Sequence, residues 1–120
     1  MQTKRLYAVR GAVCTQDTVE DIIQNTKLLY QTLIEKNHLS EQDIVSIQFT
    51  TTPDLTVLNP ASALRKAGFA SDVPLFCSCE PVFKGSLERV IRVLITAYSD
   101  CKMESAYLNG AQVLRPDLSK

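Results

Sequence analysis

The sequence predicts a single α+β domain, in which a mixed β-sheet is covered on one face by one long helix and a short helical segment. Its 120 residues suit one domain. Three observations support this class: a long amphipathic stretch early in the chain, several short β-branched runs, and a capped short helix near the middle. The predicted order is strand, long helix, strand, short helix and then further strands.

The long helix is expected over residues 19–36. Apolar side chains recur at steps of three and four from Val19 to Ile34, and polar side chains occupy the opposite face. Asp17 is the predicted N-cap, because Glu20 follows three residues later as in a capping box. His38 lies just beyond the helix, where positive charge suits the negative end of the helix dipole, so a structural role is expected for it.

Two strands are expected in the first half of the chain. One covers Leu6–Val9 and should end at Arg10-Gly11, and the other covers residues 44–50 after a capped turn at residues 40–43. Alternate positions of the second strand carry apolar side chains that should face the core: Val45, Ile47 and Phe49.

The middle of the chain predicts a short helix followed by a strand. Asn59 is the predicted N-cap, Pro60 the first helical residue and Gly68 the stop of a helix over residues 61–67. The following strand is expected over residues 73–79, because a proline is tolerated near a strand start or on an edge strand.

The last third contains one ambiguous segment and one turn signal. Residues 90–96 are densely β-branched and favour a strand, although the apolar spacing from Leu87 onward also permits a helix. Residues 105–114 are expected to form a hairpin-like region around Asn109-Gly110, a typical tight-turn pair.

Charge and composition exclude several function classes. Thirteen Lys and Arg residues balance 13 Asp and Glu residues, so the chain lacks the basic field of a nucleic-acid binder and any general attraction to acidic membranes. No stretch approaches the roughly 20 apolar residues that span a bilayer, and the first residues lack the apolar segment of a signal peptide. We therefore expect a cytoplasmic protein with free thiols, and its neutral charge suggests a defined oligomer.

The cysteines and the histidine fit no metal site. Cys77 and Cys79 form a C-x-C pair rather than a zinc motif, and His38, the only histidine, is far away in sequence. Without a basic partner, Cys77 is expected to be a small buried hydrophobic residue rather than a nucleophile. Neither a metal nor a cofactor is predicted.

Three arginines next to apolar runs are the main candidates for ligand binding: Arg10, Arg92 and Arg115. A guanidinium cannot lose its proton, so its burial is costly without an anion and full hydrogen bonding. Each could instead face water or pair with a nearby carboxylate, for Arg92 that of Glu80, Glu88 or Asp54. Three such arginines at different strand ends favour a ligand that carries carboxylates or phosphates.

Glu80 is the second kind of candidate, because it stands between a predicted strand and Pro81. Strand ends on a rigid sheet present polar groups to small ligands, although a turn carboxylate can simply face solvent. Tyr107 is expected to be a core residue whose hydroxyl finds a partner. From the residues alone, the sequence predicts a small neutral α+β protein whose arginines are suited to hold a molecule with several negative charges.

The same residues, taken in order, resemble the small monofunctional chorismate mutases of the Bacillus type. The resemblance runs from about Leu6 to Ser119 and rests on these fragments: Val9-Arg10-Gly11-Ala12, Thr52-Pro53-Asp54-Leu55, Pro60-Ala61 with Arg65, Cys77 with Glu80, Ile91-Arg92-Val93-Leu94, Tyr107-Leu108 and Val113-Leu114-Arg115-Pro116-Asp117-Leu118-Ser119.

This resemblance implies a pseudo-barrel homotrimer with active sites at the subunit interfaces, and a strand at residues 90–96. It also implies that chorismate is converted into prephenate for phenylalanine and tyrosine synthesis, without a cofactor. Two other functions are kept open: a non-catalytic or regulatory binder of an aromatic dicarboxylate, and a trimeric enzyme similar to imine deaminases.

The resemblance also implies roles for individual residues. Arg92 is expected to donate to the ether oxygen and a carboxylate, Arg10 to hold the enolpyruvyl carboxylate, and Glu80 to bind the ring hydroxyl; these three form the catalytic set. Asn59 departs from the family pattern, which has an aromatic pocket wall at this place. The full substrate-binding set is Arg10, Arg65, Phe76, Cys77, Glu80, Arg92, Tyr107, Leu114 and Arg115, with Arg65 and Arg115 near the mouth of the site.

Overall fold

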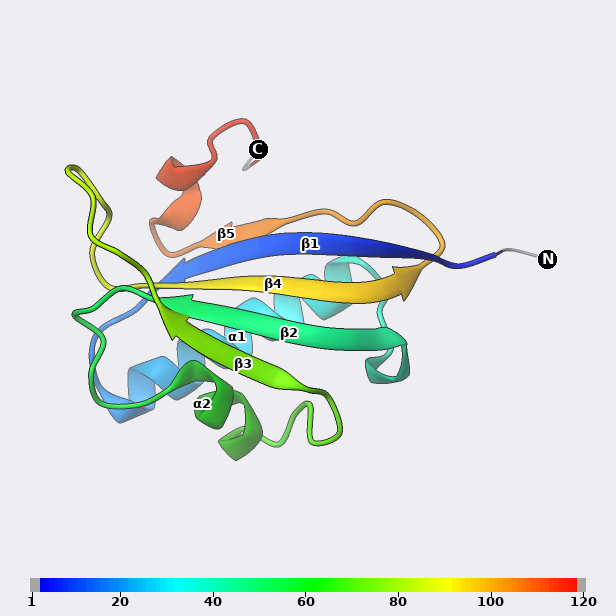
Figure 1. Ribbon diagram of the computed structural model, residues 1–120, viewed down its shortest axis with the longest axis horizontal. Helices are drawn as coiled ribbons and strands as arrows, with labels where there is room; N and C mark the ends of the chain where they lie inside the picture. Colours follow the sequence, from blue (N-terminus) through cyan, green and yellow to red (C-terminus); the bar gives the residue numbers. More distant parts are fainter. Residues whose placement is uncertain (1–2, 119–120) are drawn as a thin grey trace.

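The computed structural model describes residues 3–118, so Ser119, the last residue of the family pattern quoted above, lies outside the described residues. Its five strands form one mixed sheet in the order β3-β2-β4-β1-β5, in which β4 pairs antiparallel with β1 and β2, and the other two pairs are parallel (Figure 1). The elements are β1 (Arg5–Cys14), α1 (Val19–Lys36), η1 (Glu41–Asp43), β2 (Ile44–Thr51), α2 (Pro60–Lys66), β3 (Leu75–Cys79), β4 (Val90–Ser99), β5 (Ala106–Leu108) and η2 (Ala111–Leu114), where η marks a 3₁₀ turn.

Both α-helices pack on the same face of the sheet and enclose the hydrophobic core there (Figure 1). Alternate strand residues such as Val13, Phe49 and Ile95 meet Leu33 of α1 and Leu64 of α2. The predicted α+β class and the helix-covered mixed sheet are therefore confirmed, as is the strand at residues 90–96.

Within residues 3–118, no helix has the length and apolar character needed to cross a membrane.

The predicted end of the first strand at Arg10-Gly11 is wrong, because β1 continues to Cys14. Gly11 serves close packing rather than a turn. A Cβ atom built on it would lie 2.8 Å from the Ala106 carbonyl oxygen and 3.1 Å from a methyl carbon of both Leu29 and Leu33. The missing side chain therefore lets β5 and α1 approach β1 at the same point.

Gly11→Ala should destabilise the fold by about 1–3 kcal/mol, the usual cost of overpacking a dense core. The contact with Ala106 involves a backbone oxygen, which cannot rotate away as a side chain can. The expected result is a lower midpoint in urea unfolding followed by circular dichroism. A midpoint equal to that of the wild type would show that β1 and β5 can separate at no cost.

The N-cap of α1 is Thr18, so the prediction of Asp17 is wrong. The Thr18 hydroxyl accepts the backbone N–H of Asp21 at 3.1 Å. Asp17 instead anchors a distant loop: its carboxylate accepts the N–H and the hydroxyl of Thr56 at 2.9 and 2.8 Å and the N–H of Val57 at 3.2 Å. These hydrogen bonds, chiefly that from the Thr56 backbone, lower the pKa of Asp17.

Asp17→Asn should therefore destabilise the protein more at pH 7 than at pH 3. A carboxyl whose pKa is lowered by folding contributes stability above its unfolded pKa of about 3.9, and that stability is lost as the pH falls through the folded value. Urea unfolding of both proteins at the two pH values measures the difference. An equal loss of unfolding free energy at pH 3 and pH 7 would exclude a contribution from the charge.

The short helix follows its predicted signals. The Asn59 side chain accepts the N–H of Ala61 at 2.8 Å, Pro60 is the first helical residue, and Gly68 follows the helix end with a φ of +92°. The predicted capped turn is also present, because the Ser40 side chain caps η1.

Two predictions in the strands are wrong. The pairing of β2 with β4 shifts register between Ile44 and Ser46, which leaves Ile44 buried and Val45 44% exposed. The hairpin over residues 105–114 does not form, because β5 joins the sheet parallel to β1. Asn109 and Gly110 do turn the chain, with φ values of +55° and +99°, but they lead into η2.

Candidate functional site

Arg92 and Glu80 form an ion pair on the face of the sheet that the α-helices leave uncovered. The neighbours of Arg92 in β4, Ile91 and Val93, are core residues, so strand alternation places Arg92 on the opposite face. Its Nε lies 2.9 Å from Oε1 of Glu80, and the two side chains are 47% and 22% exposed. The sequence offered a carboxylate partner for Arg92 as one alternative, and the structure contains that pair.

Glu80 is held in place from the end of β2. Its backbone N–H donates to the Thr51 carbonyl at 2.8 Å, and the Thr50 hydroxyl donates to Oε1 of Glu80 at 2.6 Å. Oε1 of Glu80 therefore accepts hydrogen bonds from both the Thr50 hydroxyl and the Arg92 guanidinium. The ion pair lies in a hollow of about 290 Å³ whose lining also includes polar and apolar side chains: Thr52, Asp54, Pro81, Val82, Phe83 and Leu87.

Tyr107 and Arg10 lie beside this pair on the same face. Tyr107 of β5 and Arg92 of β4 are both register partners of Ala12 in β1, so the three form one row across the strands. Tyr107 is buried against Leu114 of η2 in a small second core. Arg10 is two residues from Ala12 on the same strand face.

The segment after η2 brings Arg115 close to Arg10. Arg115 and Asp117 form a two-point ion pair, with Nε–Oδ1 at 3.0 Å and Nη2–Oδ2 at 2.8 Å. The pKa of Asp117 is lowered chiefly by the Arg115 hydrogen bonds and also by the charge of Arg10. The lining of a hollow of about 650 Å³ includes four cationic side chains, those of Arg10, Lys36, Lys102 and Arg115, and two acidic ones, those of Glu104 and Asp117. The cationic side chains outnumber the acidic ones, so this hollow suits an anionic group.

Five predicted site residues do not line these hollows within one chain: Arg65, Phe76, Cys77, Tyr107 and Leu114. Tyr107 and Leu114 pack in the small second core beside the ion pair, whereas the other three lie apart from it. Arg65 is exposed on the last turn of α2, on the helical side of the sheet. The Cys77 side chain packs against the core, and this burial raises its pKa. Phe76 lies on the edge strand β3 with 71% of its surface exposed, facing the same side of the sheet as Arg92. The predicted set therefore divides into two groups.

Thr50, Thr52 and Asp54 line or support the hollow, and the sequence analysis did not assign them to the site. They stand in a run that reads as a strand end followed by a Pro-Asp turn. The local signals were weak: three consecutive threonines, Thr50 to Thr52, and the Thr52-Pro53-Asp54-Leu55 fragment of the family resemblance. Hydrogen bonds from side chains to a distant backbone leave no periodic pattern in the sequence.

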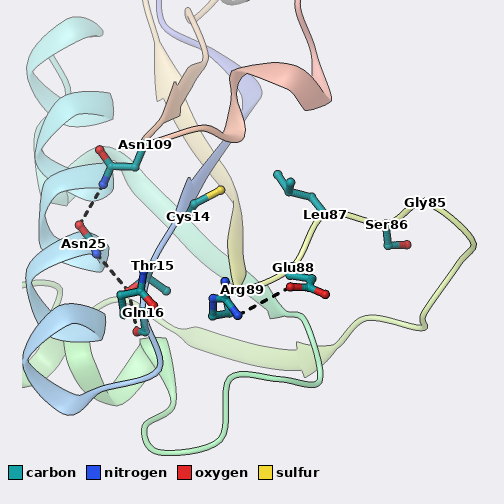
Figure 2. Close-up of a pocket in the computed structure, with 10 residues that line it drawn as sticks. All are labelled: Cys14, Thr15, Gln16, Asn25, Gly85, Ser86, Leu87, Glu88, Arg89 and Asn109. Carbon is teal, nitrogen blue, oxygen red and sulfur yellow. Dashed lines mark hydrogen bonds and ion pairs between the residues drawn. The ribbon is translucent and has the colours of Figure 1, made fainter.

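Another hollow, of about 680 Å³, lies where β1 ends (Figure 2). Asn109 donates to Asn25 and Asn25 donates to Thr15, each at 3.0 Å, so these side chains satisfy one another along one wall. On the opposite wall, Arg89 lies 3.7 Å from Glu88. None of the predicted site residues lines this hollow.

Among residues 3–118, no group of three or more His, Cys, Asp or Glu side chains is placed to hold a metal ion.

The comparison with known families agrees with this geometry. The family model for chorismate mutase type I matches residues 6–118. The chain belongs to this family. Its chorismate mutase relatives include AroH of Bacillus subtilis, 39% identical over 118 residues, and AroH of Thermus thermophilus, 40% identical over 115 residues. These alignments cover 95% and 92% of this chain, and 93% of each relative.

A solved chorismate mutase from Clostridium thermocellum has the same fold. It superposes with a TM-score of 0.84 at 40% identity, covering 89% of this chain and 98% of that structure. The resemblance to chorismate mutases seen in the sequence is thus confirmed, and with it the assignment to a family of isomerases.

Proposed function

We propose that this protein is an intramolecular isomerase that converts chorismate into prephenate by a pericyclic rearrangement, in the synthesis of phenylalanine and tyrosine. The observation that carries the proposal is the Arg92–Glu80 pair, fixed in a hollow of a chain that belongs to the chorismate mutase type I family. A reducing cytoplasm suits its four cysteines, all of which are free thiols.

The reaction needs no acid, base or nucleophile. One C–O bond of the dianion breaks as one C–C bond forms, and negative charge develops on the ether oxygen. The protein must therefore select the compact conformer and stabilise that charge. A fixed cation is effective because it needs no reorganisation during the reaction.

The side chains on the uncovered face match these needs. Arg92 uses its Nε for Glu80, and a guanidinium has four further N–H donors that can reach the ether oxygen and a carboxylate. The Glu80 carboxylate accepts a hydrogen bond from the ring hydroxyl of the substrate. Arg10, with Tyr107 beside it, holds the enolpyruvyl carboxylate, and Arg115 adds positive charge at the mouth of the site, next to Leu114.

We further propose that the second group of site residues comes from a neighbouring copy in a homotrimer. Arg65 and Cys77 cannot share a hollow with Arg92 inside one chain, because they lie on the helical side of the sheet. Phe76, Leu94 and Tyr98 are exposed apolar side chains on the uncovered side. An uncovered apolar sheet face is typical of a subunit interface, so this side should meet the β3–α2 edge of the next copy.

A chorismate assay on the purified protein tests the proposal. The expected result is loss of chorismate with stoichiometric formation of prephenate, and inhibition by a bicyclic dicarboxylate that imitates the transition state. Binding without turnover would identify a regulatory binder instead. Turnover of imino acids but not of chorismate would identify an enzyme similar to imine deaminases.

A further inference from the structure

We infer that Thr52 and Asp54 are positioning residues for Arg92: they fix the first residues of β4 to the end of β2 and so set where the guanidinium lies. The inference rests on the proposed function, because it assigns these two side chains a role in the same reaction. Neither is placed in contact with substrate.

The two side chains bind consecutive backbone groups at the start of β4. Both carboxylate oxygens of Asp54 accept the N–H of Arg89, at 3.2 and 3.0 Å. The Thr52 hydroxyl donates to Oδ1 of Asp54 at 2.5 Å and accepts the N–H of Val90 at 3.0 Å. The Thr52 backbone N–H donates to the Val90 carbonyl at 3.2 Å. Thr52 and Asp54 therefore bind the backbone N–H groups of residues 89 and 90 and the carbonyl of Val90.

The backbone at Arg89 needs such support. Its φ of +51° is in the left-handed region, which is unfavourable for a residue with a side chain and persists only where surrounding contacts enforce it. Thr15, the residue after β1, provides one contact through its N–H to the Arg89 carbonyl at 3.0 Å. Asp54, in the turn that follows β2, provides the other. Arg89 thus forms a fixed entry point from the loop into β4.

This entry point determines the position of Arg92. Val90 is almost fully buried, and Arg92 is two residues further along the same strand face, opposite Thr50. The loop that precedes β4 spans residues 80–89, so without the contacts from residues 52–54 its end could shift along the sheet. A misplacement of about 1 Å can cost on the order of 100-fold in rate.

The same stretch of chain also positions the partner of Arg92. Thr50 and Thr51 bind the side chain and the backbone N–H of Glu80, and Thr52 and Asp54 bind residues 89 and 90. Figure 1 shows why this is possible, since β2 and β3 end and β4 begins at one edge of the sheet. Residues 50–54 therefore fix both members of the ion pair relative to each other.

Thr52 and Asp54 act through the backbone rather than on a ligand. Thr52 is buried, and its hydroxyl is used by Asp54 and Val90. Asp54 lines the hollow, but its carboxylate oxygens receive the Thr52 hydroxyl and the Arg89 N–H. The inference therefore predicts a change in the position of Arg92 when these groups are altered.

The chain contains a matched control for these contacts. At the other end of the sheet, Glu41 accepts the Tyr30 hydroxyl at 2.5 Å and the N–H of Ala70 at 2.9 Å. Ala70, like Arg89, has a left-handed backbone, with a φ of +57°. This anchor has the same chemistry but holds no residue of the proposed site. Tyr30→Phe thus corresponds to Thr52→Val, and Glu41→Gln corresponds to Asp54→Asn.

The test compares turnover of chorismate by these variants. Thr52→Val and Asp54→Asn should lower kcat by about tenfold or more, on the scale of a misplaced catalytic group, with KM changed less than kcat. Thr52→Ser keeps the hydroxyl and should restore kcat. Tyr30→Phe and Glu41→Gln should lower thermal stability but leave kcat unchanged. Equal effects on kcat in both sets, or a normal kcat in Thr52→Val, would overturn the inference.

A second readout does not depend on turnover. The Nε–H of Arg92 donates to Glu80, and its ¹H–¹⁵N signal should move toward that of an exposed arginine in Thr52→Val and Asp54→Asn only. An unchanged signal would overturn the inference even if activity fell. If the wild type does not convert chorismate, the proposed function fails, and this signal alone then decides whether Thr52 and Asp54 position Arg92. If Thr52→Val does not fold, Asp54→Asn and Thr52→Ser are measured in the same way.

Discussion

Arg92→Ala is expected to reduce kcat for chorismate by about 10²–10³-fold, equivalent to ~3–4 kcal/mol, the usual effect of removing one donor from a developing oxyanion. The charge on the ether oxygen exists only in the transition state, so KM should change much less than kcat. Arg92→Lys keeps the positive charge but loses the planar arrangement of donors that serves Glu80 and the substrate together. It should therefore remain well below the wild type.

The fold of Arg92→Ala should remain intact, because the side chain is about half exposed and Glu80 keeps the Thr50 hydroxyl as a partner. Thermal unfolding and circular dichroism of the variant check this. Arg5→Ala, which removes an exposed arginine at the start of β1, is the matched control and should keep full activity. Wild-type turnover by Arg92→Ala would show that electrostatic stabilisation by this residue is not the mechanism.

Elements with local causes could be predicted from the sequence. Helix α1 is specified by its own apolar spacing, and α2 by the Asn59 cap and Gly68, so neither depends on distant residues. The errors arise where distant residues decide. Gly11 stands inside a strand rather than in a turn, because Leu29 and the Ala106 carbonyl leave no room there for a side chain. Asp17 does not cap the helix, because its carboxylate binds Thr56 instead.

The site shows the same division. Arg92 and Glu80 could be predicted, because a charge inside an apolar run and a carboxylate at a strand end are visible in the sequence itself. Thr52 and Asp54 could not, since their partners are backbone groups of residues 89 and 90, which sequence does not distinguish from any others. Arg65 was placed in the site by resemblance alone, and one chain leaves it apart from Arg92.

Mixing Arg92→Ala with Arg65→Ala subunits is expected to restore activity that neither variant has alone. Arg92→Ala lacks the central cation. Arg65→Ala should lose about 10–100-fold in kcat/KM, the equivalent of one hydrogen bond to a charged group. If each site joins Arg92 of one copy to Arg65 of the next, a mixed trimer contains interfaces at which both arginines are intact. The assay uses substrate well below KM, after the two proteins are unfolded and refolded together.

The size of the recovery follows from how identical subunits assemble in a ring. With equal amounts of the two variants, half of the copies supply an intact Arg92 and half of their neighbours supply an intact Arg65, so about a quarter of the sites should be complete. The mixture should then approach a quarter of wild-type kcat/KM, whereas the two variants refolded separately and combined afterwards should give only the average of their own activities. A site contained within one chain could never be restored in this way, because every copy would carry one of the two defects. Equal activity of the co-refolded and the separately refolded samples would therefore place Arg65 outside the active site or on the same chain as Arg92.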